Sequence, residues 1–331
     1  MTNSILLGTW IRRFLLEHLV AERNLALNTQ KSYRDMLMKL LPFLAEKTSK
    51  SIDRLIIDDL SAQNIRLFLS HVEESGCSIS TRNQRLAGIH ALTRFIGEHN
   101  LEYIEWSSQI RFVPFKKTDH PEITYLDKSE MDALLAAHDK QTAQGEREHA
   151  LLLFLYNSGV RASEAVDLKI SDIDWYAKCV RIVGKGNKER RCPLWESTMN
   201  QLRLLVGKRS TDQPVFLNRC CQQMTRSGIY TLVKRCATRA CKQAPSLQGK
   251  TVSPHVIRHT TASHLLQAGV DINTIRGWLG HVSLRTTNIY AEIDLATKAR
   301  ALAACTVKDN EAKTRKRWRD QPDLLKFLRN L

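Results

Sequence analysis

The chain has 331 residues, a length that accommodates two ordinary domains, each with its own core. Its net charge of +16 favours a polyanionic partner, with nucleic acid first, although an anionic membrane surface or solubility alone would also fit. No run approaches the ~20 consecutive apolar residues of a membrane span. Arg12, Arg13 and Glu17 also interrupt the opening segment, so we expect neither a membrane span nor a signal peptide. The expected location is the cytoplasm.

The cysteines do not form a metal-binding pattern. No two of them stand in a C-x-x-C pair with a second pair or a histidine set downstream, so a zinc site is not expected. Reduced thiols that serve as small core or surface residues are the expected state. The eight are Cys77, Cys179, Cys192, Cys220, Cys221, Cys236, Cys241 and Cys305.

The first hundred or so residues are predicted to be all-helical, because apolar residues recur there at helical spacing. Asn28 and Ser61 are expected N-caps, and Gly76 stands where a glycine commonly follows a helix. The expected helices cover residues 6–22, 29–44, 61–74 and 80–98.

A linker is predicted at residues 111–125, where two prolines and two adjacent lysines interrupt any regular period. It would join a first domain at residues 1–110 to a second at 126–305. Lys116 and Lys117 could follow DNA phosphates, but a solvated basic linker is an equally good interpretation.

The second domain is predicted to be mainly helical with a small antiparallel sheet. Residues 126–138 and 146–159 indicate helices, and the second is apolar enough to be a central core helix. Residues 173–194 alternate, are rich in Val, Ile, Trp and Tyr, and contain the turn Gly-Lys-Gly-Asn at 184–187, which predicts a hairpin. Helices are expected to resume near Glu196 and to continue, with interruptions, to Ala304.

The tail at residues 306–331 carries eight Lys/Arg against four Asp/Glu. Its last nine residues, 323–331, predict a short helix with an apolar face, which is too small to be stable alone. We expect it to dock either on its own domain or on a neighbouring subunit.

The segment SPHVIRHTTASHLLQAG predicts a helix that suits an anion. Ser253 is an expected N-cap, Pro254 takes the first helical position and Gly269 ends the helix. His255 and Arg258 then face the same side near the N-terminus, where backbone NH groups also favour phosphate. An ordinary helix with surface His and Arg side chains would show the same pattern.

Two further segments contain residues that could act on the same phosphate as that helix. Arg161 follows a glycine at the end of the apolar helix, with Glu164 three residues on, and two guanidiniums can share one phosphate. His281 precedes Tyr290 by nine residues, although a single tyrosine near a helix is usually a packing residue.

Taken together, the pieces SGVRASE, GKGNKERR, HVIRH, LGH and the final Tyr290 resemble the tyrosine recombinases, which include phage integrases and Xer-type enzymes. The resemblance covers residues 126–304, and the N-terminal helices resemble the family's SAM-like core-binding domain. It places the catalytic positions at Arg161, Lys185, His255, Arg258, His281 and Tyr290.

The resemblance implies a site-specific recombinase that cleaves double-stranded DNA through a covalent bond between Tyr290 and a backbone phosphate. Arg161 and Arg258 would stabilise the charge that develops on that phosphate, and His281 would donate a hydrogen bond to it. The family acts as a tetramer and needs neither ATP nor a metal, so no cofactor is expected.

The remaining implied roles concern proton transfer and orientation. His255 is a candidate general acid/base, and Lys185 at the hairpin would protonate the leaving 5′ oxygen. Glu164 could orient Arg161, although a helix-surface ion pair is an equally good interpretation.

Two alternatives remain open: a noncatalytic DNA-binding protein of the same fold and a type IB topoisomerase. Among recombinases, the early start of the first domain leaves little room for an arm-type DNA-binding domain. A role for a mobile element or in simple resolution is therefore favoured over that of an arm-site phage integrase.

Overall fold

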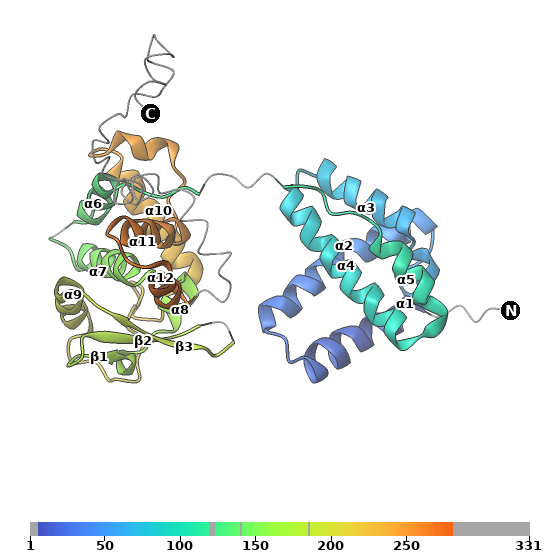
Figure 1. Ribbon diagram of the computed structural model, residues 1–331, viewed down its shortest axis with the longest axis horizontal. Coiled ribbons are helices and arrows are strands. Elements are labelled where there is room, and N and C mark those ends of the chain that lie inside the picture. The colour runs from blue at the N-terminus through green and yellow to red at the C-terminus, as the bar shows by residue number, and fades with distance from the viewer. Residues whose placement is uncertain (1–5, 119–122, 140, 185, 281–331) are drawn as a thin grey trace, which may run out of the picture. The chain divides into compact units, whose positions relative to one another are not determined.

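The computed structural model describes residues 6–118, 123–139, 141–184 and 186–280 (Figure 1). The chain divides into two compact units, Met1–Pro121 and Glu122–Leu331, and each has its own apolar core. Within the described residues, no helix combines the length and apolar character needed to cross a membrane.

The first unit is helical throughout, as its periodicity predicts. A π-helical segment, Phe14–Glu22, continues α1 directly, and its Phe14 ring packs against those of Tyr33 and Phe95. α4 is central because it contacts α2, α3 and α5. The helices are α1 (Leu7–Arg13), α2 (Leu27–Thr48), α3 (Ala62–Glu74), α4 (Ile79–His99) and α5 (Ile104–Arg111), with short 3₁₀ segments at Ile52–Arg54, Ile57–Asp59 and Leu101–Tyr103.

One of the two predicted N-caps in this unit is confirmed. The Ser61 hydroxyl accepts a hydrogen bond from the Asn64 backbone N–H at 3.1 Å, and Gly76 has the positive φ of +81° expected after a helix. The prediction for Asn28 is wrong: the first turn of α2 already closes on the carbonyl of Ala26, which takes the cap position without a side-chain hydrogen bond.

The second unit combines helices with one small sheet, which lies at one edge of the unit in Figure 1. The strands run antiparallel in the order β1-β2-β3, with Val180 opposite Cys192 and Ile182 opposite Arg190. This confirms the predicted hairpin. The elements are α6 (Lys128–Ala136), α7 (Ala143–Ser158), α8 (Ala162–Asp167), β1 (Ile173–Asp174), β2 (Cys179–Val183), β3 (Glu189–Pro193), α9 (Glu196–Val206), α10 (Arg226–Ala240), α11 (Pro254–Gln267) and α12 (Ile272–Leu279), with 3₁₀ segments at Ile170–Asp172 and Pro245–Gly249.

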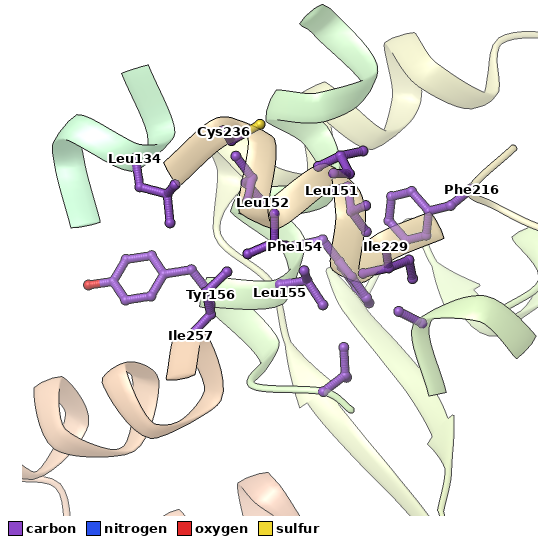
Figure 2. Packing of buried hydrophobic residues seen from close by; sticks show 14 of the residues in the cluster. Leu134, Leu151, Leu152, Phe154, Leu155, Tyr156, Phe216, Ile229, Cys236 and Ile257 are labelled. Carbon is purple, nitrogen blue, oxygen red and sulfur yellow. The ribbon is translucent and has the colours of Figure 1, made fainter. Parts of the chain in front are cut away.

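α7 is the central core helix that its composition predicts. It contacts α6, α9, α10 and α11, and a helix that is apolar on most of its faces is stable only when it is surrounded in this way. Figure 2 shows Leu152 and Phe154 of α7 among side chains from the neighbouring elements, including Ile229 of α10 and Phe216. The C-terminal end of α7, which leads to Arg161, is therefore fixed by the core.

The predicted helices beyond Gly280, the basic tail at 306–331 and the terminal helix at 323–331 lie outside the described residues. The positions of Lys185, His281 and Tyr290 lie outside them as well.

Candidate active site

The N-terminus of α11 has the capped start that the sequence predicts. The Ser253 hydroxyl accepts a hydrogen bond from the Val256 N–H at 3.2 Å, and Pro254 occupies the first turn. His255 on this turn is exposed, whereas Arg258, three residues later, is 1% exposed. The two side chains share one side of the helix but differ sharply in burial.

Three of the predicted site residues line one groove. Arg161, at the start of α8, lines this groove together with His255 and Arg258. The volume of the groove is about 700 Å³. Arg226 of α10 adds a further basic side chain to the same wall. Guanidiniums, an imidazole and a helix N-terminus around one hollow make a site suited to a phosphate group. The other lining residues are Ala162, Ser163, Ser227, Tyr230, Ser253 and Pro254.

The electrostatics of this groove favour a neutral imidazole. Although the residue is exposed, the protein atoms around its ring remove part of the ring's hydration; this desolvation, followed by the charges of Arg258 and Arg161, lowers the pKa of His255 below its usual value. The neighbouring His259 ring lies 4.3 Å away between centroids, and burial lowers the pKa of His259 to about 4. His255 therefore presents a neutral imidazole to the groove near pH 7.

Arg258 also holds the backbone around the groove. Its Nη1 donates to the Gly159 carbonyl at 2.6 Å and its Nη2 to the Leu279 carbonyl at 2.7 Å. Gly159 ends α7 with φ of +59°, and a Cβ there would lie 2.5 Å from a Leu279 methyl carbon. Arg258 thus joins the ends of α7 and α12, and only glycine fits at position 159.

Glu164 is a buried group: its side chain is 4% exposed. Its carboxylate accepts hydrogen bonds from the Arg161 backbone N–H at 2.9 Å and from Arg161 Nη1 at 2.8 Å. Burial alone would raise the pKa of Glu164, but hydrogen bonds and charge from Arg190, then those from Arg161, outweigh it and hold this pKa below its usual value. The carboxylate therefore stays ionised against Arg161.

Sequence reasoning missed Arg190, the second partner of Glu164. Arg190 lies opposite Ile182 and on the same side of β3 as the buried Cys192, so it occupies an inward-facing position of the strand. A charged residue at an inward position was the available signal, because such a residue needs a buried partner.

No described cluster of three or more His, Cys, Asp or Glu side chains is arranged to hold a metal ion.

The comparison with known families decides the identity of the chain. Residues 124–296 match the phage integrase family, and residues 11–99 match the phage integrase N-terminal SAM-like domain. The chain belongs to the phage integrase family of tyrosine recombinases. These enzymes cleave and rejoin DNA, so the chain is a DNA breaking and rejoining enzyme of the site-specific recombinase class.

Curated relatives carry integrase and Xer names. The protein y4rC of Sinorhizobium fredii, which is named as an integrase/recombinase, is 35% identical over 335 residues, covering 100% of both chains. Tyrosine recombinase XerD of Vibrio cholerae is 31% identical over 280 residues, which cover 82% of this chain and 88% of XerD.

Solved structures share the fold. The XerH recombinase in its post-cleavage complex with a palindromic difH substrate matches with a TM-score of 0.65 and 23% identity, over 85% of this chain and 81% of that one. The Tn1549 transposon integrase in complex with transposon right end DNA matches with a TM-score of 0.68 and 16% identity, over 88% and 98% respectively. The mainly helical architecture with one small sheet is therefore that of the tyrosine recombinases.

Proposed function

We propose that this chain recombines double-stranded DNA at a specific site and holds the scissile phosphate in the groove at the N-terminus of α11. The observation that carries the proposal is the convergence of Arg161, His255 and Arg258 on this one groove. The net charge of +16 supports a polyanionic substrate, and the XerH and Tn1549 structures contain DNA.

The proposed reaction is a transfer of the phosphate from one oxygen to another. The Tyr290 hydroxyl oxygen attacks phosphorus, the bond to the 5′ oxygen breaks, and a 3′-phosphotyrosyl ester forms. His255 takes the tyrosine proton, which is needed because a phenol has a pKa of about 10. Lys185 gives a proton to the leaving 5′ oxygen, and a new 5′ hydroxyl reverses the step.

The other proposed roles are electrostatic. Arg161 and Arg258 stabilise the charge on the five-coordinate phosphate, and preorganised donors of this kind each contribute about 10²–10³ in rate. His281 donates to the same phosphate, and Glu164 orients Arg161. Because phosphate bond energy is retained in the tyrosyl ester, the cycle balances without ATP.

In the proposed organisation, residues 1–110 bind DNA, 126–305 carry the reaction, and four protomers assemble on DNA. A mobile element, through its integration, excision or transposition, is the proposed biological context. The integrase/recombinase name of y4rC, which matches over its full length, supports that context.

The test is a covalent adduct assay. Wild type and Tyr290→Phe are incubated with a nicked suicide duplex from the sequence that flanks the gene, and denaturing gels are run for a protein-DNA adduct. We expect the adduct with wild type and none with Tyr290→Phe. Tight binding of both without any adduct would make the chain a DNA-binding protein of this fold, and relaxation of a plasmid without a specific site would indicate a topoisomerase.

A further inference from the structure

A buried ion pair is joined to the candidate site through Arg161. Arg190 on β3 faces Glu164 on α8 with both ends of its guanidinium: Nη2 donates to Oε2 at 2.7 Å and Nη1 to Oε1 at 3.3 Å. The Arg190 side chain is 9% exposed and that of Glu164 is 4% exposed. Since Glu164 also binds Arg161, each of its carboxylate oxygens accepts two hydrogen bonds, and both arginines bind the same carboxylate.

The same guanidinium holds the end of α12. Arg190 Nε donates to the Trp278 carbonyl at 2.9 Å, and the following carbonyl, that of Leu279, accepts from Arg258. The last carbonyls of a helix lack internal partners and carry a partial negative charge, so two guanidiniums fix this end firmly. A Cβ on Gly280 would lie 3.0 Å from Arg190 Nη1, so the backbone just before His281 packs on Arg190.

The β2–β3 hairpin also packs against the Arg190–Glu164 ion pair. A Cβ on Gly184 would lie 3.3 Å from Glu164 Oε1 and 3.4 Å from Arg190 Nη1. Gly184 is the residue before Lys185, and its N–H donates to the Lys188 carbonyl across the turn at 2.8 Å. The backbone on the N-terminal side of Lys185 is therefore packed against the ion pair.

We propose that Arg190 is a positioning residue for strand cleavage, which through its ion pair with Glu164 holds Arg161 and the backbone at Gly184 and Gly280. These two glycines directly precede Lys185 and His281 in the chain. The inference rests on the proposed function, because it assigns Arg190 to the support of groups that act in that reaction. Arg190 is not among the described residues that line the groove. A lysine cannot replace it fully, because one ammonium cannot make the fork to the carboxylate and the bond to Trp278 together.

The matched control is a second buried carboxylate in the same unit. Glu148 on α7 is 1% exposed and pairs with Arg235 and Arg239 of α10, and none of these residues lines the groove. Glu148→Gln removes a comparable buried charge and so reports what a purely structural loss does to cleavage.

The experiment measures adduct formation on two versions of the substrate identified by the adduct assay. One is the ordinary duplex; the other replaces the bridging 5′ oxygen at the cleaved phosphate with sulfur. A thiol has a pKa of about 8.5, so a leaving thiolate needs no proton, and misplacement of Lys185 no longer slows the step. Variants are Arg190→Met, Arg190→Lys, Glu148→Gln and, as the reference for a missing acid, Lys185→Ala, each with DNA affinity and thermal unfolding measured beside it.

We expect Arg190→Met to slow cleavage of the ordinary duplex by about 10–100-fold, as is typical for groups that orient functional side chains. On the sulfur substrate we expect a smaller decrease in the cleavage rate, because the part due to Lys185 is absent. The decrease that remains should come from the weaker positioning of Arg161 and His281. Arg190→Lys should lie between wild type and Arg190→Met, which keeps the test valid if the methionine variant folds poorly. Combining Arg190→Met with Glu164→Gln should slow cleavage by less than the product of the two single effects.

Either of two results would overturn the inference. One is Arg190→Met cleaving both substrates at the wild-type rate; the other is Arg190→Met and Glu148→Gln slowing both substrates by the same factor, which marks a loss of fold alone. Absence of an adduct with wild type on both substrates is a different result, because it removes the proposed function and this inference with it.

Discussion

Glu164 and Glu148 are buried carboxylates of the same unit, each paired with two arginines, yet they are held differently. The partners of Glu148, Arg235 and Arg239, come from one helix, and their side chains are 46% and 36% exposed. Glu164 binds Arg161 and the 9% exposed Arg190, which come from different elements. The ion pairs of Glu148 thus join two helices near the surface. The ion pairs of Glu164 instead connect segments that lead into the proposed catalytic positions.

The largest predicted effect tests this difference directly. Glu164→Gln leaves the guanidinium of Arg190 buried without its counter-charge, and we expect a loss of about 3–5 kcal/mol in the free energy of unfolding. Glu148→Gln should cost only about 1–3 kcal/mol, because its arginines can turn toward water. Urea unfolding of the full chain, followed by circular dichroism, measures both; equal losses would mean that partner exposure does not set the cost.

His259 extends the comparison to a group that burial keeps neutral. Its folded-state pKa of about 4 lies below the ordinary 6.5, so the unfolded chain binds the proton more readily. The contribution of His259 to stability is therefore fully present above pH 6.5 and is lost as the pH falls from 6.5 to 4. At 1.36 kcal/mol per pKa unit this loss is at most about 3 kcal/mol, because the ring is partly exposed and water screens it.

Calorimetry across this pH range checks the prediction for His259. The His259→Gln chain should lose less stability between pH 6.5 and 4 than wild type does. An unchanged slope would show that His259 is already protonated in the folded chain at pH 6.

The junction held by Arg258 gives an effect of similar size. Gly159→Ala places a Cβ against Leu279 at a positive φ, and we expect a loss of about 3 kcal/mol in unfolding free energy from clash and backbone strain together. Gly269 has φ of +86°, and no atom of the described residues lies within 4 Å of an added Cβ, so Gly269→Ala should cost only about 1 kcal/mol. Thermal unfolding of the two variants isolates the packing at the junction; similar losses would assign the whole cost to the backbone.

The smallest effect is expected at an exposed ion pair. Lys178 and Glu196 meet at 2.5 Å with side chains 56% and 60% exposed. Lys178→Ala should leave the free energy of unfolding nearly unchanged, since water screens such pairs. A loss in urea unfolding as large as that of Glu148→Gln would remove burial as the explanation for the cost of the buried pairs.

The sequence predicted the features that depend on neighbours a few residues away. The Ser253 cap of α11, the hairpin around residues 184–187 and the apolar α7 all follow from local spacing, because capping and periodicity involve one or two turns of chain. The cap at Asn28 failed for a local reason as well, since the first turn of α2 closes two residues earlier, on Ala26.

Only the tertiary structure decided which charges lie together and which are buried. Nothing local in the sequence marks Arg258 as 1% exposed or pairs Arg190 with Glu164, because these contacts join segments that meet only when α8, β3, α11 and α12 pack around one core. Patterns within one element specify that element. The strength of a buried ion pair depends on water excluded by all its neighbours, which is a property of the folded chain.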